Sequence, residues 1–302
     1  MKPLHIQTPL LQSRSLQNKL GKQVYFKLEA LQPSGSFKLR GIGRLCQKVC
    51  ADGTKSLAAS SGGNAGVAVA YCGMKLNKPT TIFIPDSSHQ IYINAIRSYG
   101  ADVIISGKTA GDAQIAAIEF AKTQQSAYIH PFDHPEIWQG HSTMIDEIVS
   151  QQIRPDVVIV SVGGGGLACG VLEGMHRHGW HNVPFIAVET VGADVFSQSI
   201  QVNHPVTLSS ITSKATSLGS TYVTPKLMEW ATKHPIKNIV VSDDQAELGS
   251  RLFASDQRLL VELASGASLS LVYDDNPVIH DYHSILVIIC GGINTCHFNI
   301  LR

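Results

Sequence analysis

The sequence lacks the features that draw a protein to nucleic acid or to a membrane. Its 24 lysine and arginine residues are balanced by 23 aspartate and glutamate residues, so the formal net charge is only +1. No segment approaches the ~20 uninterrupted apolar residues of a transmembrane helix. The amino-terminal stretch MKPLHIQTPLLQSRSL also lacks the continuous apolar region of a signal peptide. We therefore expect a cytoplasmic protein that acts on a small molecule, with no nucleic-acid or membrane partner.

Paired cysteines and metal-binding spacings are absent as well. The 6 cysteines are scattered without a CxxC unit, which favours a reducing compartment over a disulfide-dense secreted module. The chain has 13 histidines, some of them grouped as His176, His178 and His181 or as His130, His134 and His141. Neither spacing puts two ligands on one helix face beside an acidic partner, so we expect surface or loop histidines rather than a transition-metal site.

What the sequence does contain is the pattern of an α/β protein. Hydrophobic residues make up 44% and charged residues 16% of its 302 positions, which is typical of a compact globular protein. Short β-branched runs alternate with amphipathic stretches, as in βαβ units built around mainly parallel sheets. The predicted strands are Val24–Leu28, Ser56–Ala59, Thr80–Ile84, Val103–Ile105, Val157–Val162, Phe185–Val188, Ile239–Ser242 and Ile285–Ile289. The predicted helices are Asn64–Leu76, Ala113–Thr123, Trp138–Ser150, Leu167–Arg177, Pro225–Lys233 and Asp244–Leu260.

The length suits two domains. Proline-bearing turns near Gln32-Pro33-Ser34 and Asp133-His134-Pro135 are the best candidates for their junctions. The sequence thus predicts a large domain formed by residues 1–32 and 135–302, and a small inserted domain formed by residues 33–134.

The first candidate functional segment surrounds a lysine. Lys38 lies in SGSFKLRG, among small residues and between glycines. A lysine by itself is more often a solvated surface charge. The functional interpretation of Lys38 therefore depends on the other motifs.

The second segment, SSGGNAG, joins a predicted strand to the helix that begins at Asn64. Its glycines let the backbone approach an anion closely, and the free amides at the helix start supply donors that suit a carboxylate. A plain helix cap explains this segment about equally well.

The third segment consists of four consecutive glycines, Gly163, Gly164, Gly165 and Gly166, between a buried strand and a helix. Successive exposed amides and the helix dipole favour a phosphate ligand. The same segment also fits G-x-G-x-x-A through Gly163, Gly165 and Ala168, so a nicotinamide dehydrogenase is an alternative. That alternative leaves the lysine and asparagine motifs unexplained.

A fourth candidate is Cys290 in ICGG, at the end of an apolar run. Alone, such a cysteine is usually a small buried hydrophobic residue. At the end of a strand it can also present a weak S–H donor to a cleft.

Taken together, the motifs PSGSFKLRG, SSGGNAG, SVGGGGL and ICGG resemble those of the fold type II pyridoxal-phosphate enzymes. The resemblance covers nearly the whole chain and is greatest to the serine and threonine dehydratases, in particular the serine dehydratase branch. It is supported by HIQTPL, PFDHPEIWQGH, VPFIAVET, ITSKATSLG and LVELASGAS. It implies a tryptophan synthase β-like α/β fold with two lobes, each a mainly parallel twisted sheet flanked by helices, and a homodimer.

The resemblance also implies roles for individual residues. Lys38 would be the Schiff-base lysine and general base, and Ser61 a second catalytic residue. The cofactor pyridoxal 5'-phosphate would be bound by Phe37, Lys38, Asn64, Gly163, Gly164, Gly165, Gly166, Leu167 and Cys290. The substrate would be bound by Ser61, Gly62, Gly63 and Asn64. A monovalent cation such as K⁺ would be bound by Glu189, Ala193, Leu218 and Ser220.

The implied reaction converts L-serine to pyruvate and ammonia, and also L-threonine to 2-oxobutyrate. Threonine dehydratase and serine racemase activities remain alternatives within the same fold.

Leu263 stands where related enzymes usually carry proline, and Ser217 where many carry alanine. The chain also ends soon after Cys290, without the longer terminal helix usual in the family, and with no appended regulatory domain expected.

Overall fold

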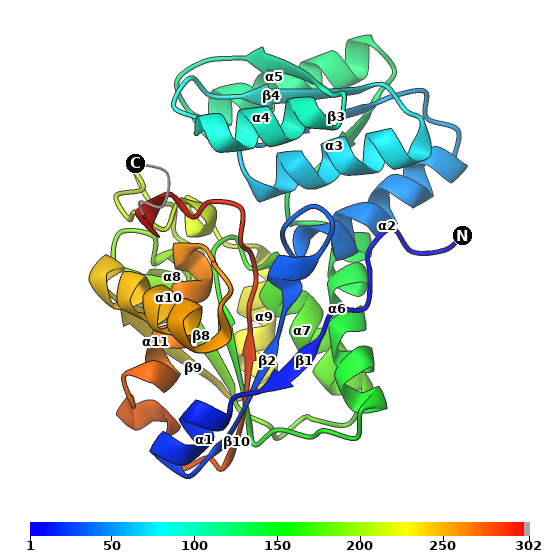
Figure 1. Cartoon of the computed structure of the whole chain (residues 1–302). Coiled ribbons are helices and arrows are strands. Elements are labelled where there is room, and N and C mark those ends of the chain that lie inside the picture. Colours follow the sequence, from blue (N-terminus) through cyan, green and yellow to red (C-terminus); the bar gives the residue numbers. More distant parts are fainter. Residues whose placement is uncertain (299–302) are drawn as a thin grey trace. The chain divides into compact units, whose positions relative to one another are not determined.

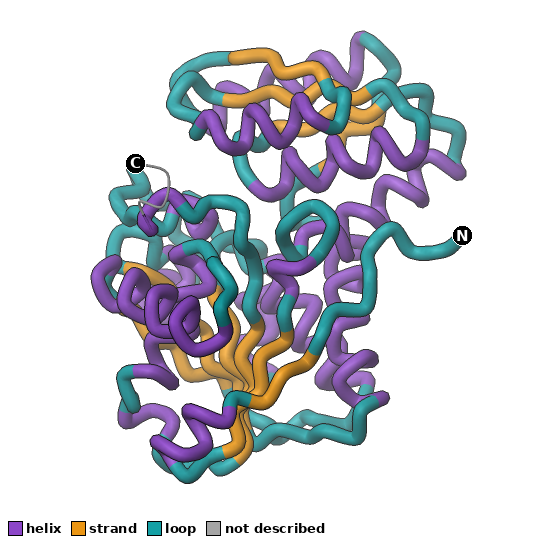
Figure 2. The backbone as a smooth tube through the Cα atoms, viewed as in Figure 1, coloured by secondary structure: helices purple, strands orange, loops and turns teal. Residues whose placement is uncertain are grey.

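Two mainly parallel sheets organise the chain in a computed structural model, which describes residues 1–298 (Figures 1 and 2). The chain divides into two compact units. The smaller unit comprises Met1–Ile6 and Gln32–His141, and the larger comprises Gln7–Leu31 and Ser142–Arg302. The boundary falls within α6 (Pro135–Ser150).

The smaller unit is built on a four-stranded parallel sheet in the order β5-β4-β3-β6. Its strands are β3 (Leu57–Ser60), β4 (Thr80–Ile84), β5 (Asp102–Ile105) and β6 (Ala127–Ile129), and its helices are α2 (Lys38–Ala51), α3 (Asn64–Leu76), α4 (Gln90–Ser98) and α5 (Ala110–Thr123). The buried alanines Ala113 and Ala117 let α5 pack closely on Phe83 of β4. A capping box between Thr109 and Asp112 fixes the start of that helix.

The larger unit contains a six-stranded sheet in the order β1-β2-β10-β7-β8-β9, in which only β1 is antiparallel. The strands are β1 (Leu10–Gln12), β2 (Gln23–Lys27), β7 (Val157–Ser161), β8 (Phe185–Thr190), β9 (Ile236–Val241) and β10 (Ser284–Ile288). The helices are α1 (Arg14–Leu20), α7 (Gly166–Arg177), α8 (Val195–Val202), α9 (Pro225–Lys233), α10 (Asp243–Gln257) and α11 (Leu263–Tyr273). Short 3₁₀ helices lie at Glu29–Leu31, Thr216–Leu218, Pro277–Ile279 and Cys296–Phe298.

Helices cover both faces of the larger sheet, with α10 and α11 on one side and α7 and α9 on the other (Figure 1). Every residue of β7 and every residue of α11 is buried. A strand buried on both faces is the expected consequence of parallel βαβ connections. The mainly parallel α/β architecture predicted from the sequence is therefore confirmed.

Several elements differ from the sequence-based prediction. Helices α1, α2, α4, α8 and α11 and the three-residue strands β1 and β6 were not predicted. The helix predicted to reach Leu260 ends at Gln257, because Arg258 adopts a left-handed conformation with φ 58° and caps it. Within residues 1–298, no helix combines the length and the apolar character needed to cross a bilayer.

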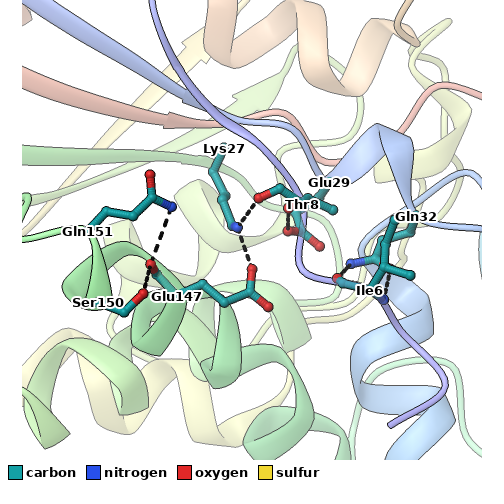
Figure 3. Close-up of polar contacts among 8 residues, drawn as sticks. All are labelled: Ile6, Thr8, Lys27, Glu29, Gln32, Glu147, Ser150 and Gln151. Atoms are coloured by element: carbon teal, nitrogen blue, oxygen red, sulfur yellow. Dashed lines mark hydrogen bonds and ion pairs between the residues drawn. The ribbon is translucent and has the colours of Figure 1, made fainter.

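A buried lysine ties β2 to its neighbours in the larger unit (Figure 3). Lys27 has no solvent exposure, and its Nζ donates to the Thr8 carbonyl at 2.7 Å and forms an ion pair with Glu147 of α6. The Thr8 hydroxyl donates in turn to Glu29 Oε1 at 2.6 Å. Burying a charged lysine is costly unless it is paired and hydrogen-bonded. This network therefore fixes the chain on both sides of β2.

The helix that follows the four-glycine segment, α7, is joined to α9 at both ends. Near their amino termini, Thr224 N donates to the Gly164 carbonyl at 3.0 Å. Near their carboxyl termini, His176 Nε2 lies 3.0 Å from His234 Nδ1, and His234 Nε2 donates to the Val183 carbonyl at 2.8 Å. Because that carbonyl can only accept, Nε2 of His234 carries the ring proton and Nδ1 accepts from His176.

This pair predicts a loss of stability in acid. Burial lowers the pKa of His234 from 6.5 to about 4, so the unfolded chain binds a proton that the folded chain excludes between those values. The contribution of His234 to the free energy of unfolding is fully present above pH 6.5. As the pH falls toward about 4, the free energy of unfolding decreases by about 3 kcal/mol through this residue. When urea unfolding is measured from pH 7.5 to pH 4, the free energy of unfolding should decline less steeply in His234→Gln than in the wild type. The exposed His204→Gln is the control, and a decline in His234→Gln as steep as in the wild type would refute the prediction.

Candidate active site

Lys38 is the first residue of α2 and is half-buried in the smaller unit. Its Nζ donates to the Pro131 carbonyl at 2.7 Å. The same nitrogen lies 5.3 Å from the centroid of the Phe37 ring and 5.9 Å from that of Phe132. Lys38 is therefore not a solvated surface lysine. Its amine has a fixed acceptor and two aromatic neighbours.

Two glycines allow α2 to approach the segment that carries His141. A Cβ on Gly41 would lie 2.4 Å from the Ile137 carbonyl oxygen, and one on Gly140 would lie 2.5 Å from Gly41 Cα. This close approach brings the fully buried His141 ring to 4.8 Å from the Phe37 ring. Burial, together with the Lys38 charge, holds the pKa of His141 well below its usual range. The histidine beside Phe37 is therefore neutral.

The segment from Ser61 to Gly63 turns the chain from β3 into α3 within the smaller unit. A Cβ on Gly66 would lie 2.0 Å from the Ser61 carbonyl oxygen, so this position requires glycine, and a Cβ on Gly62 would lie 2.1 Å from Ser88 Oγ. In the described part of the chain, the backbone amides of Ser61, Gly62 and Gly63 donate no hydrogen bond. Asn64 is buried at the first position of α3. The turn thus presents free donors at a helix start, as an anion requires.

The four-glycine segment leads from β7 into α7 in the larger unit. Gly165 has a left-handed backbone with φ 92°, and a Cβ on Gly163 would lie 2.8 Å from the Leu218 carbonyl oxygen. Among residues 1–298, the amides of Gly163 to Leu167 donate no hydrogen bond to protein. They combine with the positive end of the α7 dipole to favour an anion such as phosphate.

Cys290 follows β10, which pairs in parallel with β7. Because adjacent parallel strands end at the same edge of a sheet, Cys290 and the four-glycine segment lie at the same edge. Burial and the charge of Glu262 raise the pKa of the Cys290 thiol to about 12, so the thiol is uncharged. Its Sγ lies 3.4 Å from Ser265 Oγ of α11, and that hydroxyl also donates to the Gly291 carbonyl at 2.9 Å.

Glu189 is fully buried at the end of β8. Its two carboxylate oxygens accept from Phe196 N at 2.8 Å, Ser197 N at 2.7 Å and Asn238 Nδ2 at 3.0 Å. Burial outweighs these donors and raises the pKa of Glu189 to about 7. Of the other predicted cation ligands, Leu218 accepts from Ser220 N through its carbonyl, and the Ser220 hydroxyl donates to the Tyr222 carbonyl at 2.6 Å.

The structure thus distributes the predicted residues over two sets. The smaller unit holds Phe37, Lys38, Ser61, Gly62, Gly63 and Asn64, and the larger unit holds Gly163, Gly164, Gly165, Gly166, Leu167, Glu189, Ala193, Leu218, Ser220 and Cys290. Sequence reasoning missed the residues that support them. Pro131 and Phe132 flank Lys38, and Ser265 contacts Cys290. The only available signals were the segments PFDHPEIWQGH and LVELASGAS, which carry the resemblance without indicating which residues touch the site.

Comparison with known proteins identifies the family. The model of a family described as pyridoxal-phosphate dependent enzyme matches residues 1–291. The chain is 40% identical over 303 residues to an L-serine dehydratase/L-threonine deaminase of Bos taurus, covering 97% of this chain and 93% of that protein. It is 42% identical over 314 residues to an L-serine dehydratase of Dictyostelium discoideum, covering 97% and 89%. A crystal structure of an L-serine ammonia-lyase from Rhizomucor miehei superposes with a TM-score of 0.91 at 36% identity, covering 96% and 95%. The chain therefore belongs to the family of pyridoxal-phosphate dependent enzymes.

Proposed function

We propose that this protein is an L-serine ammonia-lyase that releases pyruvate and ammonia from L-serine, and 2-oxobutyrate from L-threonine. Relatives about 40% identical over nearly the whole chain carry these activities in their names. The observation that carries the proposal furthest is Lys38, a half-buried lysine at a helix start whose amine donates to the Pro131 carbonyl and lies within 6 Å of two aromatic rings. The family match removes the reason to consider a nicotinamide dehydrogenase.

The residues present fit pyridoxal phosphate. Lys38 would carry it as a Schiff base, with Phe37 against its ring and Asn64 near its hydroxyl group. The unbonded amides from Gly163 to Leu167 suit its phosphate, because they have no competing protein acceptor among the described residues. When bound, the cofactor supplies an electron sink for the bonds broken at the substrate α-carbon.

The substrate carboxylate would accept from the amides of Ser61, Gly62 and Gly63. This contact selects an α-amino acid over a simple amine, because an amine leaves those donors without a partner. The Lys38 amine would then take the α-proton as general base. The rings of Phe37 and Phe132 lie 5.3 Å and 5.9 Å from the amine nitrogen and would flank it during this step.

Cys290 would face the ring nitrogen of the cofactor. Its raised pKa keeps the thiol neutral, so it cannot stabilise a protonated ring as a carboxylate would. Negative charge on the substrate would consequently be short-lived. This favours prompt loss of the β-hydroxyl of serine over transamination.

Three further features belong to the same proposal. Glu189, Ala193, Leu218 and Ser220 would hold a monovalent cation such as K⁺, a role that the family resemblance implies for these positions. The family resemblance favours a homodimer, which sedimentation would test. A cytoplasmic location is favoured by cysteines that are all free in the described residues.

The proposal predicts that the purified protein shows the visible absorption of a lysine-linked cofactor and forms pyruvate from L-serine. A lactate dehydrogenase-coupled assay measures pyruvate, and the same assay with L-threonine measures 2-oxobutyrate. Chiral chromatography for D-serine tests for racemase activity. Cofactor binding with none of these products would refute the proposed lyase activity, and D-serine as the main product would favour a racemase instead.

A further inference from the structure

The Pro131 carbonyl accepts a hydrogen bond from Lys38 Nζ, at 2.7 Å. It lies in the short segment between β6 and α6, within the smaller unit that also contains Lys38. A backbone carbonyl does not titrate, so it accepts a hydrogen bond at any pH. The groups that hold this carbonyl in position therefore contribute to the placement of the Lys38 amine.

His130 holds it. The Nδ1 atom of His130 accepts from Phe132 N at 3.2 Å and from Asp133 N at 2.8 Å, which closes a turn around Pro131. A nitrogen that accepts requires a neutral ring with its proton on Nε2. Burial lowers the pKa of His130 to about 4, with the charges of Lys38 and His134 adding to this effect and that of Asp133 opposing it. Near neutral pH, His130 therefore remains an acceptor.

The same turn places an aromatic neighbour of the amine. The ring of His130 packs edge-on against the buried Phe132 ring at 4.9 Å, and that ring lies 5.9 Å from Lys38 Nζ. The pyrrolidine ring of Pro131 restricts the backbone between the two side chains. One histidine thus fixes two of the groups that surround the amine.

We propose that His130 is a positioning residue for Lys38, because it holds the Pro131 carbonyl as the resting acceptor of the amine whenever the amine is not covalently linked. The consequence for turnover rests on the proposed function, in which the released amine must stay close to the substrate α-carbon. An amine that donates one N–H to the carbonyl still has its lone pair available for the α-proton. The hydrogen-bond geometry itself does not depend on the proposed function.

The test compares His130→Leu with His130→Asn. Asparagine carries Oδ1 on Cγ, where histidine carries Nδ1, so it can accept the same two amides, as it does in Asx turns. The full chain is freed of cofactor with hydroxylamine, and acetylation of Lys38 by acetic anhydride is measured by mass spectrometry relative to the exposed Lys75. In His130→Leu, loss of the hydrogen bond between Lys38 Nζ and the Pro131 carbonyl should raise the rate of Lys38 acetylation about tenfold. His130→Asn should remain close to the wild type.

His134→Leu is the matched control. Its Nδ1 accepts from Glu136 N at 3.1 Å in the same segment, so this change removes a similar bond without affecting the turn around Pro131. It should lower the unfolding temperature without changing the acetylation of Lys38. Equal increases in both leucine variants, or no increase in His130→Leu, would overturn the proposal.

Two further measurements keep the test decisive. If His130→Leu does not fold, His130→Gln replaces it, because its acceptor lies one carbon further out. Acetylation as slow in His130→Gln as in His130→Asn would then count against the proposal. With L-serine, kcat should fall about tenfold in His130→Leu while KM changes little. If no variant, and not even the wild type, forms pyruvate while acetylation follows the expected pattern, the proposed function fails and the positioning role stands.

Discussion

Replacement of Lys38 by alanine is expected to abolish both turnover and the visible absorption of the lysine-linked cofactor. The variant loses the only covalent attachment point and the base that takes the α-proton, and a general base alone accounts for about 10² to 10⁴ in rate. The rings nearest to the Lys38 amine among its described contacts are those of Phe37 and Phe132. A phenylalanine ring cannot form the covalent link. We therefore expect pyruvate formation to fall by about 10⁴-fold or more.

The control is Lys75→Ala. Lys75 is an exposed lysine on α3 of the same unit, and its Nζ lies 5.6 Å from the Tyr71 ring centroid. Its removal should leave the spectrum and the rate unchanged. Circular dichroism and thermal unfolding should establish that both variants are folded. Wild-type pyruvate formation by Lys38→Ala would show that the lysine assignment is wrong.

The sequence predicts elements with a strong local signal. Thr80–Ile84, Asn64–Leu76 and Pro225–Lys233 begin and end where they were expected. In the last of these, Thr224 caps the helix and proline follows at its first position. Such signals lie within a few residues of each other, so they can be recognised without knowledge of the tertiary structure.

The elements that were missed depend on distant parts of the chain. Helix α2 contains Gly41 and Gly43, and an interior glycine lowers helix propensity. Gly41 is explained only by the backbone of Ile137, which lies almost a hundred positions further along the chain and would be 2.4 Å from a Cβ. Helix α11 is buried on all sides, so it has no amphipathic period to detect.

The same limit applies to the candidate site. Lys38, Asn64 and the four glycines belong to local motifs with recognisable chemistry. The side chains that support them have no such motif. Ser265 becomes meaningful only because β10 brings Cys290 beside α11, and His130 only because its turn directs a carbonyl at Lys38. Contacts of this kind are set by tertiary packing, which a single sequence does not encode in its local pattern.

The second large effect is expected in the four-glycine segment, where Gly165→Asp should reduce cofactor affinity roughly 100-fold or more. A Cβ at this position would lie 3.0 Å from Leu227 Cδ2 and from Thr224 Cγ2, in a backbone with φ 92°. The added carboxylate would also repel a phosphate held by the neighbouring amides. Fluorescence titration of the apoprotein with pyridoxal phosphate measures the change directly.

Gly179→Asp is the control. It separates repulsion of the cofactor phosphate from the effects of backbone strain and of an added negative charge. Gly179 follows the carboxyl end of α7, has a similar left-handed φ of 73°, and a Cβ there would meet no atom within 4 Å. Aspartate there carries the same charge and a comparable strain of about 1 kcal/mol, but it lies at the opposite end of the helix from the glycine segment. Gly179→Asp should therefore lower stability slightly and leave cofactor affinity unchanged. If both variants weaken cofactor binding equally, strain rather than the phosphate contact is responsible, and if neither does, the phosphate is bound by other residues.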